Sequence, residues 1–249
     1  MNRLEKVSLI IDLGKTNIKF YFVNKKTLKA KIFIFKNQII KKNKIFEVDI
    51  DYIKNILLKL LKKNSKKYII KNINFTTHGS VLIGLDANYE IITKISDENV
   101  YSNKVNQEYR EIIKKDNYNF SELMPRGYNL GKQIMYLSKY KKDTFKKIKF
   151  FLPFPQFLSF IVTNKICFDK VYINNHSHLW NFSKNKFSSL GKKSKIKDKI
   201  PYFSNVVKNY SKVGNEEIKN TTFYCAKEVR NIGLENSFME TETYIGRLN

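Results

Sequence analysis

The feature that most constrains the fold is an apolar run that ends in an aspartate, turns at a glycine and resumes as a second apolar run. It covers residues 9–22, which read Leu-Ile-Ile-Asp-Leu-Gly-Lys-Thr-Asn-Ile-Lys-Phe-Tyr-Phe. This pattern predicts a strand, a tight turn and a second strand. Gly14 has no Cβ atom, so the turn can approach an anion closely. The backbone amides of such a turn, together with the Thr16 hydroxyl, can bind phosphate oxygens.

Asp12 ends the first of these strands. Its carboxylate is placed to hold Mg²⁺ through water, because Mg²⁺ takes oxygen ligands and retains much of its hydration. The Gly-Lys-Thr triplet at 14–16 also suggests a P-loop. That motif requires a glycine where the chain has Leu9, and a helix where residues 18–23 read as a strand, so we reject it. An ordinary hairpin with a glycine turn remains the alternative to a phosphate site.

The length and composition are those of a folded protein. The chain has 249 residues, 42% hydrophobic and 14% aromatic, which is enough to form the core of one large domain or two small ones. No apolar run approaches membrane-spanning length, and the N-terminus lacks a signal-peptide pattern. Cys167 and Cys225 are isolated and lack metal-ligand spacing, as is typical of a reducing compartment. We therefore expect a cytoplasmic protein that does not span a membrane.

The formal net charge of +25 would ordinarily suggest a nucleic-acid-binding protein. The basic residues are mostly lysines spread along the whole chain, and the chain contains no RNA- or DNA-binding signature. We therefore interpret the lysines as a solvated surface with some attraction for a phosphorylated ligand. A basic nucleic-acid-binding protein remains the weakest of the functional hypotheses, and steep salt dependence of DNA or RNA binding would favour it.

Apolar periodicity predicts an α/β domain without internal repeats or a long linker. Three strands, a helix and further strands come first, in the order expected of a ribonuclease-H-like domain, and helical patterns then dominate. We also expect the lysine-rich stretch 184–199 to be an exposed segment. The predicted strands are 7–12, 18–24, 28–36, 68–76, 81–85 and 90–92, with a turn at 86–88, and the predicted helices are 51–61, 103–115, 130–140 and 154–163.

All three histidines fall in two motif-like segments. Residues 76–80, Thr-Thr-His-Gly-Ser, follow a predicted strand, where polar groups commonly meet ligands in α/β folds. His78 can exchange a hydrogen bond with a sugar hydroxyl, although a structural role is the alternative. His176 and His178 form a His-x-His pair, but no third ligand has fitting spacing for zinc.

Further motif-like segments follow one another along the chain, and together they cover about residues 7–225. In this order the chain resembles the N-terminal half of the FGGY family of carbohydrate kinases, in particular the subgroup that begins with D-x-G-K-T-N-x-K. Each motif is weak alone, but their common order makes the set fairly specific. The residues that match are Asp12 to Lys19, Thr76 to Gly79, Asp97, Gly127, Asn129, Gly131, Gln133, Leu152, Pro153, Pro155, Gln156, His176, Leu179 and Trp180.

The resemblance implies two ribonuclease-H-like domains around a cleft that binds ATP and Mg²⁺, with the sugar mainly against the N-terminal domain. Such enzymes transfer the γ-phosphoryl group of ATP to a sugar or polyol hydroxyl, and catalysis is largely positioning and charge neutralisation with one base. The subgroup suggests a ketose, deoxy-ketose or related small sugar as substrate.

The resemblance also assigns candidate site residues. Asp97 is the strongest sugar-side candidate, because a carboxylate can accept hydrogen bonds from neighbouring sugar hydroxyls. Helix packing is the alternative for Tyr128, Gln156 and Trp180. The phosphate-side and ATP-binding candidates are Asp12, Gly14, Lys15, Thr16, Asn17 and Lys19, with Asp12 acting through Mg²⁺, and the sugar-side candidates are His78, Gly79, Asp97, Tyr128, Gln156 and His176.

The chain departs from the family after Cys225. The family's catalytic aspartate belongs to a segment such as Y-C-G-I-H-D-S-N, whereas Val229 stands near its place here, and Glu228 has no motif support as a substitute. Residues 227–249 contain one Lys, two Arg and four Glu, so they carry −1 where the rest is strongly basic. We therefore expect an N-terminal kinase domain at 1–225 and an atypical tail at 226–249 that reflects a shifted frame or truncation.

These departures bear on function. Without a second domain and its aspartate, we expect this chain alone to have little or no kinase activity and an uncovered interface. The leading hypothesis is a carbohydrate kinase present as its N-terminal domain. The alternatives are a non-catalytic sugar- or phosphate-binding relic, or one half of a split kinase that pairs with a separately encoded second domain, and a homodimer is also open.

Overall fold

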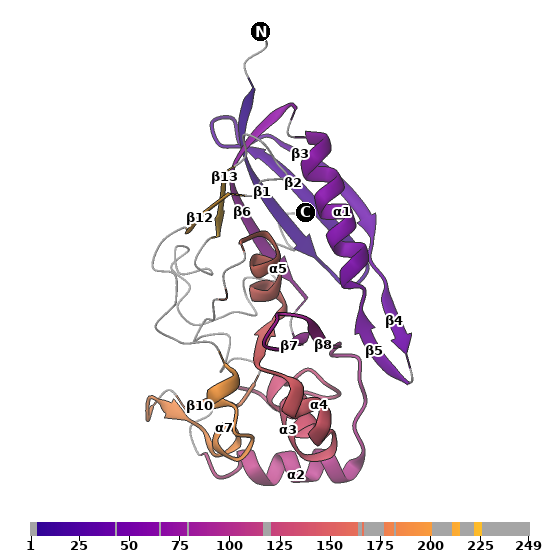
Figure 1. Cartoon of the computed structure of the whole chain (residues 1–249), viewed down its shortest axis with the longest axis vertical. Helices are drawn as coiled ribbons and strands as arrows, with labels where there is room; N and C mark the ends of the chain where they lie inside the picture. Colours follow the sequence, from indigo (N-terminus) through magenta and orange to yellow (C-terminus); the bar gives the residue numbers. More distant parts are fainter. Residues whose placement is uncertain are drawn as a thin grey trace.

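The protein is an α/β structure with two sheets, seen here in a computed structural model (Figure 1). The six-stranded sheet and helix α1 occupy one end of the long axis, and helices α2, α3, α4 and α7 occupy the other. The mixed α/β fold predicted from the sequence is confirmed. The structure describes residues 4–42, 44–64, 66–78, 80–116, 121–163, 166, 177–181 and 183–200, together with the backbone of 211–214 and 222–225.

The larger sheet has the strand order β12-β13-β6-β1-β2-β3. Strands β1, β2 and β3 pair antiparallel in sequence, whereas β6 runs parallel to β1 and β13 runs parallel to β6. The carboxyl ends of β1 and β6 therefore lie side by side. The strands are β1 (Glu5–Leu13), β2 (Asn17–Asn24), β3 (Ala30–Lys36), β6 (Tyr68–Thr77), β12 (Ser211–Gly214) and β13 (Thr222–Cys225).

Alternation of apolar residues explains this sheet. In β1 every second residue from Val7 to Leu13 is buried, and β2 buries Ile18, Phe20 and Phe22 in the same way. Helix α1 (Ile50–Asn64) runs alongside the sheet and buries an apolar stripe at helical spacing. The Tyr52 hydroxyl ties the helix to the end of β3 by donating to the Lys36 carbonyl over 3.0 Å.

The second sheet has the order β4-β5-β8-β7-β9, and its pairs are antiparallel. Its central hairpin was predicted, and the Asp86 carboxylate caps the turn by accepting from the backbone of Asn88 and Glu90. The strands at 39–42, 45–48 and 150–153 were not predicted. Each has only four residues, and lysines interrupt the apolar pattern of the first two. The strands are β4 (Ile39–Lys42), β5 (Ile45–Val48), β7 (Leu82–Leu85), β8 (Ile91–Ile95) and β9 (Phe150–Pro153).

Helix α5 (Phe154–Thr163) contacts β6 and β13 of the first sheet and β7 and β9 of the second, so it joins the two sheets. The four predicted helices are confirmed as α1, α2, α3 and α5, while α4 and α7 are short additions. The helices of the distal end are α2 (Asn103–Ile113), α3 (Leu130–Tyr140), α4 (Lys142–Lys147) and α7 (Ser189–Lys193).

The prediction that 184–199 is an exposed segment is wrong. Residues 183–200 form strand β11 (Lys186–Phe187), helix α7 and the 3-10 helix η1 (Lys197–Lys199), and Leu190 and Ile196 are fully buried. Strand β11 pairs with β10 (Trp180–Asn181). Because lysines dominate this stretch, its apolar positions were not recognised as core residues. Leu190 and Ile196 anchor the segment to the core.

Candidate functional site

The first part of the candidate site is the turn between β1 and β2. The Gly14 amide donates to the Asn17 carbonyl over 2.9 Å, and a Cβ atom at Gly14 would lie 3.2 Å from that same oxygen. A strand follows the turn, in agreement with the rejection of a P-loop. The turn is thus a tight hairpin in which a side chain at Gly14 would be crowded, with Lys15, Thr16 and Asn17 at its tip.

Asn37, which sequence reasoning missed, clamps this turn from the end of β3. Its side-chain amide donates to the Gly14 carbonyl over 2.7 Å, and its backbone amide donates to the Thr16 carbonyl over 2.8 Å. The same side chain accepts from the backbone of Gln38. A single asparagine after a strand gives only a weak signal for such a turn, because nothing local identifies the distant carbonyls that it binds.

Asp12 lies beside this turn, level with Lys19 in β2 and Thr76 in β6. Its side chain is half-buried, and burial raises the pKa of the carboxyl above its ordinary value, while the charge of Lys19 partly opposes the shift. In the described part of the chain, no group of three or more His, Cys, Asp or Glu could hold a metal ion. Asp12 offers a single hard oxygen ligand, which suits a Mg²⁺ ion that keeps most of its water.

His78 joins the phosphate turn to the second part of the site. Its backbone amide donates to the Leu13 carbonyl over 2.8 Å, and its ring stands edge-on to Phe154 at 5.9 Å between centroids. Both ring nitrogens are buried and have no hydrogen-bond partner among the described residues, and the same holds for the Thr77 hydroxyl. Burial lowers the pKa of His78, although the nearby Asp97 carboxylate opposes the shift. Unsatisfied buried groups of this kind are expected where a ligand binds.

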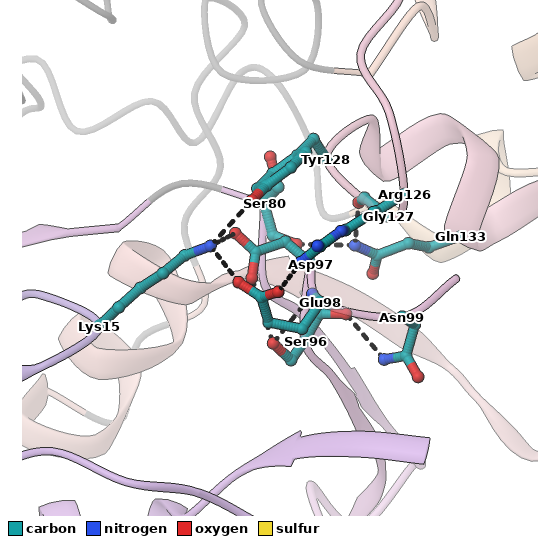
Figure 2. A network of polar contacts seen from close by, with 10 residues as sticks. All are labelled: Lys15, Ser80, Ser96, Asp97, Glu98, Asn99, Arg126, Gly127, Tyr128 and Gln133. Carbon is teal, nitrogen blue, oxygen red and sulfur yellow. Dashed lines mark hydrogen bonds and ion pairs between the residues drawn. The ribbon is translucent and has the colours of Figure 1, made fainter. Parts of the chain in front are cut away.

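The second part is a charged cluster around the loop that follows β8, shown in Figure 2. The Asp97 side chain is only 2% exposed, and the Lys15 ammonium lies 3.1 Å from its Oδ2 atom. Lys15 also contacts Glu98 at 2.5 Å, donates to the Tyr128 hydroxyl over 3.2 Å and lies over the Tyr128 ring. Arg126 pairs with the other oxygen of Glu98. Lys15, predicted with the phosphate side, therefore extends into the sugar-side group.

The electrostatics of this cluster are dominated by Lys15. Burial lowers the pKa of its ammonium, but hydrogen bonds to Glu98 and Tyr128 and the charge of Asp97 outweigh burial and raise the pKa above its usual range. The hydrogen bond from Lys15 holds the pKa of Glu98 below its ordinary value. Lys15 is therefore a fixed positive charge between two carboxylates at neutral pH.

The G-x-N-x-G-x-Q segment holds the charged loop in place. The Gly127 amide donates to the Asp97 carbonyl over 3.0 Å, and the Gln133 side chain donates to the Gly127 carbonyl over 2.6 Å and to the Ser80 carbonyl over 2.7 Å. A Cβ atom at Gly131 would lie 1.8 Å from the Ser177 carbonyl oxygen, so only glycine fits there. These residues position the site through hydrogen bonds to backbone carbonyls.

The remaining candidates divide into buried residues and residues outside the described part. Gln156 is buried in α5, and Trp180 packs edge-on against Phe187. His178 bonds through both ring nitrogens, accepting from the Tyr109 hydroxyl at 2.6 Å and donating to the Ser121 carbonyl at 2.7 Å. The Ser121 carbonyl fixes the ring proton of His178 on Nε2. Since both ring nitrogens are hydrogen-bonded within the protein, we assign His178 a structural role. Gly79, His176 and Val229 lie outside the described residues.

The comparisons identify the class of protein. The model of the FGGY family of carbohydrate kinases, N-terminal domain, matches residues 7–228. The chain therefore belongs to the FGGY family of carbohydrate kinases and contains its N-terminal domain. No curated protein sequence matches it significantly. None of the helices in the described segments is both long and apolar enough to cross a membrane.

Solved structures show the same fold. A carbohydrate kinase from Novosphingobium aromaticivorans is 17% identical with a TM-score of 0.74, over 89% of this chain and 48% of that one. A xylulose kinase from Lactobacillus acidophilus gives 17% and 0.71, over 88% and 47%. Plasmodium falciparum glycerol kinase with ADP gives 17% and 0.66, over 90% and 49%. The chain thus spans about half the length of these structures.

Proposed function

We propose that this chain is the sugar-binding part of an ATP-dependent carbohydrate kinase, which transfers the γ-phosphoryl group of ATP to a hydroxyl of a small sugar or ketose. The observation that carries the proposal is the location of a buried carboxylate, Asp97, near a buried imidazole, His78, whose ring nitrogens have no partner among the described residues. Family membership over residues 7–228 supports the same reaction class.

On the sugar side, Asp97 accepts hydrogen bonds from neighbouring hydroxyls, which fixes the orientation of the sugar ring or chain. His78 supplies a donor and an acceptor to further hydroxyls, and Tyr128 adds a hydroxyl and an apolar face. The ion pair with Lys15 holds the Asp97 side chain in position. Gly79, Gln156 and His176 complete the sugar-side group that the family resemblance implies.

On the phosphate side, the turn at 14–17 binds phosphate oxygens through its backbone amides, Thr16 and Asn17, and Lys19 contributes charge. The turn fits this role, because a Cβ at Gly14 would crowd the Asn17 carbonyl. Asp12 holds the hydrated Mg²⁺ of ATP, which would neutralise charge on the transferred phosphoryl group. The chemistry that ATP supplies is the phosphoryl group itself, while these residues bind, orient and neutralise.

Completion of the active site requires a second domain. Since Val229 stands where the family places its catalytic aspartate, we propose that the general base and the other wall of the cleft come from a second domain. We place the protein in the cytoplasm, where ATP and sugar substrates are available, and we expect no nucleic-acid partner.

The test is sugar binding to the 249-residue chain by isothermal titration calorimetry, using xylulose, gluconate and glycerol as probes. Asp97→Asn should weaken binding of the accepted sugar at least tenfold, since hydrogen bonds to a charged group contribute about 1.5–3 kcal/mol. Asp51→Asn, an exposed carboxylate in α1, is the matched control and should bind normally. Equal affinity of the two variants would overturn the assignment of Asp97.

Phosphoryl transfer is tested separately with Mg-ATP, with the 249-residue chain alone and with this chain fused to the second domain of a family member. Phosphoryl transfer by the two-domain protein, together with no transfer by this chain alone, supports the assignment as a kinase. If sugars bind but the fused protein transfers no phosphoryl group, the chain is a sugar-binding protein whose family membership records ancestry.

A further inference from the structure

A cavity of about 600 Å³ lies beside the charged loop, between helix α2 and the segment 123–126. Three basic side chains line it, Arg110, Arg126 and Lys132, and its described lining contains no acidic side chain. In a chain whose lysines are mostly scattered over the surface, this concentration of positive charge around a concave space is distinctive.

Lys132 is the unusual member of this group because its charge is buried. The residue is only 2% exposed, and within the described structure its ammonium donates to the carbonyls of Met124 at 3.1 Å and Arg126 at 2.8 Å. It also lies 5.5 Å from the centroid of the Tyr109 ring. All of these partners are neutral, whereas buried charges are ordinarily paired with an opposite charge. An ammonium has three protons, so one remains for a further acceptor beyond these two carbonyls.

Arg110 adds a second positive charge to the wall of this cavity. Burial lowers the pKa of Lys132 to about 8, and the positive charge of Arg110 contributes to that shift. Two like charges at the wall of one cavity repel each other, and an anion between them would remove the repulsion. Arg126 brings a third charge to the same wall, although its guanidinium also pairs with Glu98.

We propose that this cavity binds a small oxyanion, a phosphate or carboxylate group, through Arg110, Arg126 and Lys132. The guanidinium groups offer paired N–H donors that match two oxygens of such an anion, and the Lys132 ammonium offers its remaining N–H donor. The site is distinct from the turn at 14–17 and from Asp97. Because Arg126 also pairs with Glu98, the anion and the charged loop share one side chain.

The experiment titrates inorganic phosphate and, separately, acetate into the 249-residue chain at constant ionic strength, with affinity measured by calorimetry. Arg110→Gln should weaken the binding of the accepted anion about tenfold, the effect of losing one charged hydrogen bond. Arg110 is exposed on α2, so its replacement leaves the fold intact. Lys104→Gln removes one charge from an exposed position on the same helix, away from the cavity lining, and should bind as the wild type does.

Lys132→Met is the second test and should also lose the anion, with circular dichroism used to verify its fold. Binding of phosphate alone identifies a phosphate site, and binding of acetate as well identifies a general oxyanion site. Equal affinity of Arg110→Gln and Lys104→Gln would overturn the proposal, because it would show that phosphate binds the basic surface without a site. Sugar binding is not involved, so this result is independent of the proposed kinase function.

Discussion

The phosphate-side turn and the sugar-side loop are neighbours, yet different forces hold them. The turn at 14–17 is fixed by backbone hydrogen bonds and by the neutral side chain of Asn37. The loop at 96–99 also has backbone and neutral hydrogen bonds, but its acidic side chains are held by charges, with Lys15 between Asp97 and Glu98 and Arg126 paired with Glu98. Under the proposed function, a rigid backbone in the turn would suit a ligand of constant shape such as phosphate, whereas charged side chains in the loop could be varied between sugars.

The largest effect is expected from removing the positive charge of Lys15, which extends from the turn to the acidic side chains of the loop. Lys15→Met should destabilise the chain by about 2 kcal/mol, less than the 3–5 kcal/mol of a fully buried pair, because the Lys15 side chain is 34% exposed. The buried Asp97 then loses its ion pair. The free energy of unfolding in urea is the measurement, and salt should weaken the wild type more than the variant.

Lys19→Met is the control for this change, since Lys19 is on the strand that follows the turn and its charge lowers the pKa of Asp12. It should cost no more than about 0.5 kcal/mol. An equal loss in both variants would mean that the sugar-side loop does not depend on Lys15, and the contrast between the two regions would fail.

The second prediction concerns the turn. Asn37→Ala removes the hydrogen bond to the Gly14 carbonyl and should cost about 1 kcal/mol, with no dependence on salt because both partners are neutral. Unfolding in urea at low and high salt measures both properties. Asn88→Ala, an exposed position in the β7–β8 turn, is the control and should change stability by less than about 0.5 kcal/mol. A strong salt dependence of the Asn37 effect would contradict the distinction.

The smallest expected effect is a pH dependence from His78, which lies between the two regions. Its pKa is lowered in the folded protein, so the unfolded chain takes up a proton near pH 6.5 before the folded one does. Stability is therefore complete above that pH and declines as the pH falls toward the folded pKa, by up to about 1.4 kcal/mol per pH unit.

Unfolding in urea at pH 7.5 and pH 5.5 measures this decline. His78→Gln cannot take up the proton, so it should lack this part of the acid sensitivity, while Asp12 contributes equally to both proteins. Parallel pH profiles for the wild type and the variant would show that His78 is not protected from protonation. Adding the accepted sugar should deepen the decline in the wild type if His78 binds it in the neutral form.

The contrast also explains how much could be predicted from the sequence. The β1–β2 turn, α1, α3 and α5 depend on local periodicity and on a glycine, so the pattern of residues was sufficient. The direction of Lys15 depends on residues more than eighty positions away in sequence, and no local pattern identifies them. The sugar-side candidates Asp97 and Tyr128 were named from the family resemblance, but their link to Lys15 was not.

Other failures have the same origin. Asn37 and Lys132 act on carbonyl oxygens, and the sequence does not show which carbonyls a fold brings near a side chain. The short strands β4 and β9 gain stability only from pairing with neighbours in the second sheet, so their own residues carry little signal. In the stretch 184–199, abundant lysine concealed the buried positions Leu190 and Ile196.

The place of β13 in the large sheet has a consequence for synthesis. Its Cys225 pairs beside Ile73, so β6 receives its outer neighbour only after the second sheet and the helical end have left the ribosome (Figure 1). Until then the outer edge of β6 presents unpaired backbone groups, which are a template for pairing with another chain. The nascent protein therefore exposes a sheet edge that can pair with another chain until β13 has been synthesised.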